Sequence, residues 1–173
     1  MNLTKYINKG LSYEDYITRV EDDLENEIEN DDPKEYVQYY ALGLQRMNRI
    51  FKTFSLNPAQ ETRVKSTTNN LKLLVITEGW CGDASQILPV VEKLANALQV
   101  STHYVLRDEN MELMEKYKTN GAASIPIIIG VNDENEEAFR FGPRPQAGME
   151  MLARFKSNPD TYSADCLLYT SPS

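Results

Sequence analysis

The chain has few of the residues that mark several classes of protein. Its 173 residues include one histidine, His103, and two cysteines, Cys81 and Cys166. A single histidine excludes a histidine-rich metal site, and two cysteines do not make the disulfide framework of a small secreted domain. No apolar run approaches the ~20 residues of a membrane span. The N-terminal stretch MNLTKYINKGLSYEDYITRV lacks the apolar core of a signal peptide. We therefore expect a cytoplasmic protein with no membrane partner.

Positive charge is also scarce relative to negative charge. Lys and Arg number 18 against 26 Asp and Glu, which gives a net charge of −8 at pH 7. Nucleic acids and anionic membranes are bound through basic patches, so this balance argues against both as main partners. The hydrophobic fraction of 41% is that of an ordinary globular protein with a real core. The length predicts one domain, or one domain with an appendage.

Residues 1–70 have the periodicity of helices. Ser12 and Asp15 form a weak capping box for a helix whose other face is acidic, and we interpret that face as solvated. Its apolar face consists of Ile17, Val20, Leu24 and Ile28. Asp32, Pro33 and Glu35 predict the start of a second helix. The stripe along that helix, interpreted as core, is Tyr36, Tyr40, Leu44, Met47, Phe51 and Phe54. Asn57-Pro58 begins a third, poorly apolar helix.

From Leu71 onward the pattern is that of an α/β domain, which we place at 71–158. Residues 71–77 and 125–129 are short apolar runs typical of strands buried on both faces, and 102–106 and 138–141 predict two further strands. Helices are predicted over 87–98, interrupted by Pro89, over 111–117, and from Pro145 to about 157. This order predicts a mixed sheet flanked by helices. Residues 159–173 form a tail whose last part, 166–173, resembles translated cloning sequence, so Cys166 is left out of the functional argument.

The strongest local signal is Gly79-Trp80-Cys81-Gly82-Asp83-Ala84, between a predicted strand and a predicted helix. A cysteine in the first turn of a helix meets free N–H groups and the positive end of the helix dipole, and both favour the nucleophilic thiolate. Gly82 leaves room for an incoming chain, and Trp80 offers apolar surface to a partner. The alternative for a lone cysteine is an inert core thiol.

These residues resemble the thioredoxin family. Trp80-Cys81-Gly82 is similar to the start of the W-C-G-P-C active site, and Ser124-Ile125-Pro126 to the second signature, whose proline is cis and faces the active cysteine. Three further matches occur in the same order, at Pro89, at Asp108-Glu109-Asn110 and at Phe141-Gly142. The resemblance implies a thioredoxin-like fold, with a mixed central sheet flanked by helices and a helical N-terminal extension. The W-C-G-D-A string is similar to a bacterial subgroup described only as thioredoxin family proteins.

The departures from that pattern bear directly on function. Ala84 stands where the family has its second cysteine, and Val75 replaces the buried aspartate that shuttles protons. Cys81 would form a mixed disulfide that no neighbouring thiol resolves, so release would need glutathione, another low-molecular-weight thiol, or a thiol of the partner. The partners implied are protein or small-molecule disulfides and thiols. Neither a metal nor a resident cofactor is expected.

The charges of Asp83 and Arg144 would affect whether Cys81 is a thiol or a thiolate. Asp83 would cap the helix start, yet its charge would disfavour a Cys81 thiolate. We hypothesise that Arg144 pairs with Asp83 or with a substrate carboxylate, the alternative being an ordinary exposed arginine. Glu78 is interpreted as a surface charge and His103 as structural. The predicted partner-binding residues are Trp80, Gly82, Asp83, Ile125, Pro126, Gly142 and Arg144, around a catalytic Cys81.

Three functions remain open from the residues. The leading hypothesis is a monothiol thiol–disulfide oxidoreductase acting through Cys81. The second is a non-catalytic thioredoxin-like module that binds a peptide or protein, and the third is a peroxide or glutathione target at Cys81. Exposure of the Cys81 sulfur separates them, because a buried sulfur leaves only the binding module. The oligomeric state is open, and so is the role of the N-terminal helices, which would regulate the groove or complete the core.

Overall fold

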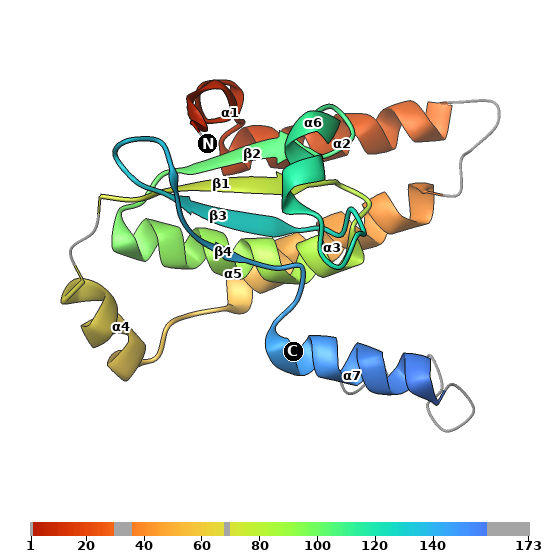
Figure 1. Cartoon of the computed structure of the whole chain (residues 1–173). Helices are drawn as coiled ribbons and strands as arrows, with labels where there is room; N and C mark the ends of the chain where they lie inside the picture. Colours follow the sequence, from red (N-terminus) through yellow and green to blue (C-terminus); the bar gives the residue numbers. More distant parts are fainter. Residues whose placement is uncertain (1, 30–35, 68–69, 159–173) are drawn as a thin grey trace.

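A computed structural model describes residues 2–29, 36–67 and 70–158 of the chain (Figure 1). The elements in chain order are α1 (Thr4–Lys9), α2 (Tyr13–Glu29), α3 (Val37–Thr53), α4 (Pro58–Lys65), β1 (Lys72–Thr77), α5 (Gly82–Leu98), β2 (Thr102–Leu106), α6 (Met111–Met114), the 3₁₀ turn η1 (Glu115–Tyr117), β3 (Ile127–Val131), β4 (Glu137–Phe141) and α7 (Gln146–Ser157).

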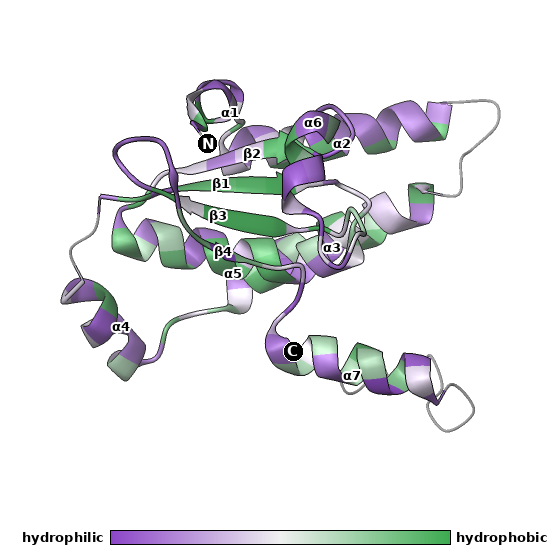
Figure 2. Cartoon of the chain, viewed as in Figure 1, coloured by the Kyte–Doolittle hydropathy of each residue, from purple (hydrophilic) through white to green (hydrophobic). Residues whose placement is uncertain are grey.

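Four strands form one mixed sheet in the order β2-β1-β3-β4. β1 and β2 are parallel and joined by α5, whereas β3 pairs antiparallel with both β1 and β4. Leu74 lies opposite His103 on one side and Ile129 on the other. β3 is buried along its whole length, as its continuous apolar sequence requires, and Figure 2 shows β1 and β3 as the most hydrophobic ribbons. The mixed sheet predicted from the sequence is confirmed.

Helices enclose the sheet from both sides (Figure 1). α5 covers one face and carries α3 packed along it, while α2 contacts both α3 and β2. α7 leaves the sheet after β4 and extends away from the body, with no fully buried residue. This arrangement brings the start of α5, at the carboxyl end of β1, close to the N-terminal helices.

The N-terminal helices share one hydrophobic core with the sheet. Tyr16, Val20 and Met47 are almost completely buried in the same cluster as Leu74 and Ile129. The segment between α1 and α2 also joins the sheet edge, because Leu11 and Tyr104 exchange two backbone hydrogen bonds of 2.8 Å. The helices therefore complete the core, one of the two roles left open by the sequence.

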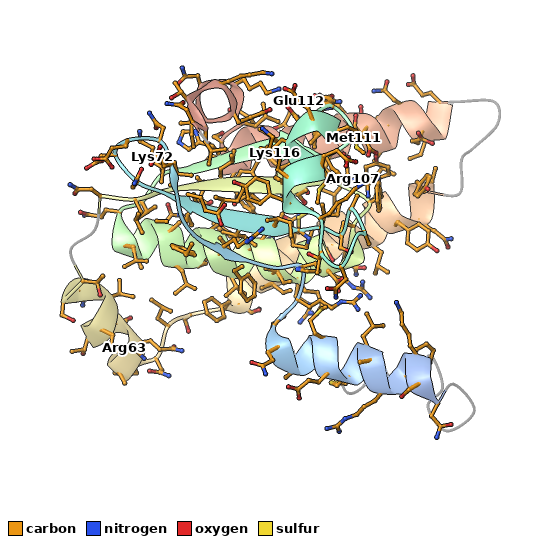
Figure 3. The ribbon with its side chains drawn as sticks, in the orientation of Figure 1. Arg63, Lys72, Arg107, Met111, Glu112 and Lys116 are labelled. Carbon is orange, nitrogen blue, oxygen red and sulfur yellow. The ribbon has the colours of Figure 1, made fainter. Side chains whose placement is uncertain are left out.

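α1 is also attached to α6 by side-chain hydrogen bonds. Figure 3 labels Glu112 on α6, and its carboxylate accepts hydrogen bonds from Lys5 and from the hydroxyl of Tyr6. Lys9 donates to Asn110 at the start of α6. The beginning of the chain is therefore attached to the second half of the fold through polar contacts as well as apolar ones.

Several predicted boundaries need correction. The helix after Cys81 continues through Pro89, which is buried, because its apolar face keeps it packed on the sheet. β3 begins at Ile127 and not at Ile125, since Ile125-Pro126 forms the turn before it. On the predicted apolar face of α2, Val20 is buried and Ile17 and Leu24 pack against the core, whereas Ile28 is 60% exposed. The buried residues of this helix also include Tyr13 and Tyr16.

The remaining predictions concern the start of the second helix, the tail, the start of α4 and membrane-spanning segments. The predicted start of the second helix at Asp32, Pro33 and Glu35 lies outside the described residues, as do the tail 159–173 and Cys166. Asn57 and Gln60 form a reciprocal capping box at the start of α4, which agrees with the helix predicted there. Within the described ranges, no helix is long and apolar enough to cross a membrane.

Candidate functional site

Cys81 lies at the junction between β1 and α5. Its thiol caps the helix by accepting a hydrogen bond from the backbone N–H of Ala84, at 3.4 Å. The same sulfur donates to the carbonyl oxygen of Ile125, 3.5 Å away. The residue is 8% exposed, so the sulfur is enclosed between the start of α5 and the turn before β3.

Burial raises the pKa of the Cys81 thiol above its ordinary value. The charge of Asp83 raises it further, whereas the Ala84 N–H and the guanidinium of Arg144 act in the opposite direction. The thiol is therefore protonated at neutral pH. The expectation that the helix start would favour the thiolate is wrong here, because the desolvation of a buried thiolate outweighs the hydrogen bonds from the backbone N–H groups of Ala84 and Asp83.

Asp83 and Arg144 form the ion pair suggested by the sequence. Arg144 Nε lies 2.7 Å from Asp83 Oδ2, and each side chain is about one-third exposed (33% and 31%). A pair this accessible to water contributes little to stability, roughly 0–1 kcal/mol. Its effect is to join the start of α5 to the loop before α7.

The turn before β3 completes the site. The Ile125–Pro126 bond is cis, as the second signature implies, and the Gly142–Pro143 bond is cis as well. Gly142 has φ of +123°, and a Cβ built on it would lie 2.2 Å from the carbonyl oxygen of Pro126. Only glycine fits this close approach. The structure therefore brings Cys81, Ile125–Pro126 and Gly142 together.

Trp80 and Gly82, the two neighbours of Cys81 in the chain, differ in their burial and in their contacts. The Trp80 ring is half-buried, with the ring of Tyr36 at 5.5 Å and the guanidinium of Arg107 at 4.8 Å from its centroid. Figure 3 labels Arg107 on the loop after β2, near α6. Gly82 is exposed, and a Cβ there would have Arg46 of α3 3.9 Å away.

Some residues around Cys81 were not found by sequence reasoning. Tyr36 was assigned to the core, but it is 44% exposed and contacts Trp80. The sequence does not place Arg46 and Arg107 at this site, because only the fold brings α3 and the loop after β2 to this end of the sheet. A basic residue directly after a buried strand, as at Arg107, is the signal that was available.

The interpretation of Glu78 as a surface charge is wrong. Its side chain is 6% exposed, and its Oε1 accepts a hydrogen bond of 2.8 Å from the backbone N–H of Asp108. Burial raises the pKa of this carboxyl to about 7. Glu78 thus joins the loop that carries Trp80 to the loop after β2.

No group of three or more metal-ligating side chains occurs in the part of the chain that the structure describes. His103 lies in β2 and bonds to the Ser101 hydroxyl at 3.0 Å. The site around Cys81 is therefore built from a thiol, backbone groups, an aromatic ring and arginines.

The family profile described as "Thioredoxin" matches residues 30–156, well over half of the chain. The chain belongs to the thioredoxin family. The predicted thioredoxin-like fold with a helical N-terminal region is likewise confirmed. No curated protein matches this thioredoxin-family chain.

Two of the solved structures similar to this thioredoxin-family chain extend over nearly all of it. A protein of unknown function from Pseudomonas aeruginosa superimposes with a TM-score of 0.62 and 15% identity, over 92% of this chain and 89% of that one. An HIV epitope scaffold reaches a TM-score of 0.65 at 14% identity, over 97% and 96% of the two chains. A thioredoxin from Fasciola hepatica is 26% identical over 54% of this chain and 88% of its own, with a TM-score of 0.37. At the low identities of the first two, the likeness concerns the fold.

Proposed function

We propose that this chain is a thioredoxin-family binding module that holds an extended segment of a partner protein beside Cys81. The observation that carries the proposal is the burial of Cys81, a residue that is 8% exposed and whose sulfur is hydrogen-bonded on both sides. A thiol that is buried and protonated is a poor nucleophile. The binding surface would consist of Trp80, Gly82 and the Ile125–Pro126 turn.

The position of Ala84 also supports binding without turnover. Ala84 is 1% exposed and occupies the place where a second thiol would attack a mixed disulfide. Within the described residues Cys81 is the only free cysteine. A disulfide exchanged onto Cys81 would therefore persist until an outside thiol arrived.

Monothiol exchange is the second candidate, and one contact favours it. The Ala84 N–H that points at the sulfur at 3.4 Å would stabilise a thiolate once a partner segment displaced the Ile125 contact. The Cys81 thiolate would attack one sulfur of a partner disulfide, and the other sulfur would leave as a thiolate. A low-molecular-weight thiol such as glutathione, once deprotonated, would then attack the mixed disulfide and release Cys81.

The setting proposed for either function is the cytoplasm of a bacterium. There the partners would be proteins or small molecules bearing thiols or disulfides, and the external thiol would be the only co-reactant. We propose no role in nucleic acid or membrane binding, because the acidic net charge of −8 disfavours both.

Capture from a lysate with the full-length protein distinguishes the two candidates. Wild-type protein and Cys81→Ser would be immobilised side by side and washed with and without reductant. A binding module captures the same partners with both proteins, and the reductant does not release them. Capture that requires Cys81 and is reversed by reductant would overturn the binding proposal in favour of exchange.

A further inference from the structure

A second concave site lies at the other end of the sheet from Cys81. α2, α3, α5 and the start of β2 surround an open pocket of about 560 Å³. This volume falls in the range of small-molecule sites, about 300–1,000 Å³. Its lining includes Tyr13, Ile17, Phe51, Glu92, Val100 and Thr102.

Glu92 is the buried charged group of this pocket, and the exposed residue Glu14 also lines it. Glu92 is 8% exposed, and its Oε2 accepts hydrogen bonds from the hydroxyls of Thr102 (2.8 Å) and Tyr104 (3.0 Å). Both of these hydrogen bonds go to Oε2, none from the described residues goes to Oε1, and Glu92 lines the pocket, which leaves Oε1 as the acceptor for a ligand. None of the described lysines and arginines forms an ion pair with Glu92. A carboxylate removed from water in this way favours a cationic partner.

Aromatic rings form the wall next to this carboxylate. Tyr13 and Phe51 are stacked with centroids 5.4 Å apart, and Tyr13 lies 5.6 Å from Tyr104. The ammonium of Lys93 is 4.3 Å from the centroid of Phe51, which shows that this aromatic cluster already attracts a cation at its edge. An apolar body attached to a cation would therefore find favourable contacts here.

We propose that this pocket binds a small organic ammonium ion with an apolar or aromatic body. The ammonium donates a hydrogen bond to Glu92 Oε1, and the body packs against Tyr13 and Phe51. Ile17 and Val100 supply further apolar lining. The site is separate from the Cys81 surface and does not depend on the function proposed for it.

Three probes that share a phenyl group test the charge requirement on the full-length protein. They are 2-phenylethylamine, which is a cation at pH 7, neutral 2-phenylethanol and anionic 3-phenylpropanoate. Titrations followed by calorimetry and by amide NMR shifts should give the amine a Kd of about 1 mM or lower. The neutral compound should bind at least about tenfold more weakly, because it forms no charge-assisted hydrogen bond. Equal binding of all three, or preference for the anion, would overturn the proposal.

Matched variants locate the binding. Glu92→Gln keeps an oxygen for Thr102 and Tyr104 but removes the charge, and it should abolish the preference for the amine. Glu134→Gln makes the same change at an exposed residue in the turn before β4 and should leave binding unchanged.

Asn48→Trp provides a check that does not depend on the fold tolerating Glu92→Gln. Asn48 is an exposed residue at the pocket rim, so a tryptophan there fills the pocket without entering the core. It should weaken amine binding at least about tenfold. Unchanged binding in both Glu92→Gln and Asn48→Trp would show that the amine binds elsewhere and would refute the proposal.

Discussion

Replacing Gly142 by alanine tests how the site around Cys81 is held together. Gly142 has φ of +123°, and its missing Cβ is where the chain approaches the Pro126 carbonyl oxygen. In Gly142→Ala, the new methyl group would lie 2.2 Å from that oxygen and 3.2 Å from Cα of Ile127. These neighbours are backbone atoms, so relief requires that the turn before β3 itself move.

The cost of this substitution has two parts. A non-glycine residue at this φ costs about 1–3 kcal/mol. Displacing the packed backbone costs a further amount of about 1–3 kcal/mol. Together they predict a loss of about 2–6 kcal/mol in the free energy of unfolding. For a central value of ~4 kcal/mol, the Tm of a chain of this size falls by roughly 8–16 °C.

Urea unfolding of wild type, Gly142→Ala and Gly121→Ala separates the two parts. Gly121 also has a positive φ, of +80°, but a Cβ there would meet nothing within 4 Å. It should therefore cost only the conformational part, about 1–2 kcal/mol. If Gly142→Ala is no less stable than Gly121→Ala, the clash with Pro126 is refuted. Because Ile125 covers the Cys81 thiol, displacing the turn should also speed alkylation of Cys81 in Gly142→Ala.

Three further predictions concern the loop that carries Cys81. The alkylation rate of Cys81 measured against pH, with Cys81→Ser as the blank for the other cysteine, should have a midpoint above ~8.5. Asp83→Asn should lower this midpoint because a negative charge near the thiol is removed. An unchanged midpoint in Asp83→Asn would contradict the contribution of Asp83 to the raised pKa of Cys81. The pKa of Glu78 is raised to about 7 from 4.5, so the folded state binds this proton more tightly and stability falls as pH rises through that interval. Glu78→Gln should match wild type near pH 4 and exceed it at pH 8 by on the order of 3 kcal/mol in urea unfolding, and equal stability at pH 8 would refute the burial argument. Tyr36→Leu should shift the emission of Trp80, the single tryptophan, to longer wavelength, whereas an unaltered spectrum would mean that the rings do not touch.

The strands and helices of the sheet region could be predicted because their signals are local. The apolar runs that became β1 and β3 are bounded by turn residues, and α5 has helical spacing on the face it buries. Pro89 was a misleading local signal. The buried face of α5 outweighs the one backbone hydrogen bond that a proline removes, so the helix continues.

The ion pair of Asp83 and Arg144 could be hypothesised from the family resemblance, but the burial of Cys81 and Glu78 could not be predicted, because the groups that cover them are distant in the sequence. The thiol of Cys81 is covered by Ile125, 44 residues further on, and Glu78 is bonded to Asp108, 30 residues further on. A helix start is visible in a sequence, whereas burial by a remote turn is not. The sequence therefore predicts a thiolate where burial raises the pKa of the Cys81 thiol, and a surface charge where burial raises the pKa of Glu78.

The two edges of the sheet are unequal in a way that limits how copies of this chain would assemble. The β2 edge pairs with Leu11 of the same chain, while all five residues of β4 are exposed at the other edge. An unpaired edge strand is a template for a strand of another molecule. Two copies that joined through β4 would close that edge in a symmetric pair, and the Leu11 bridge would obstruct pairing at Tyr104 on the opposite edge.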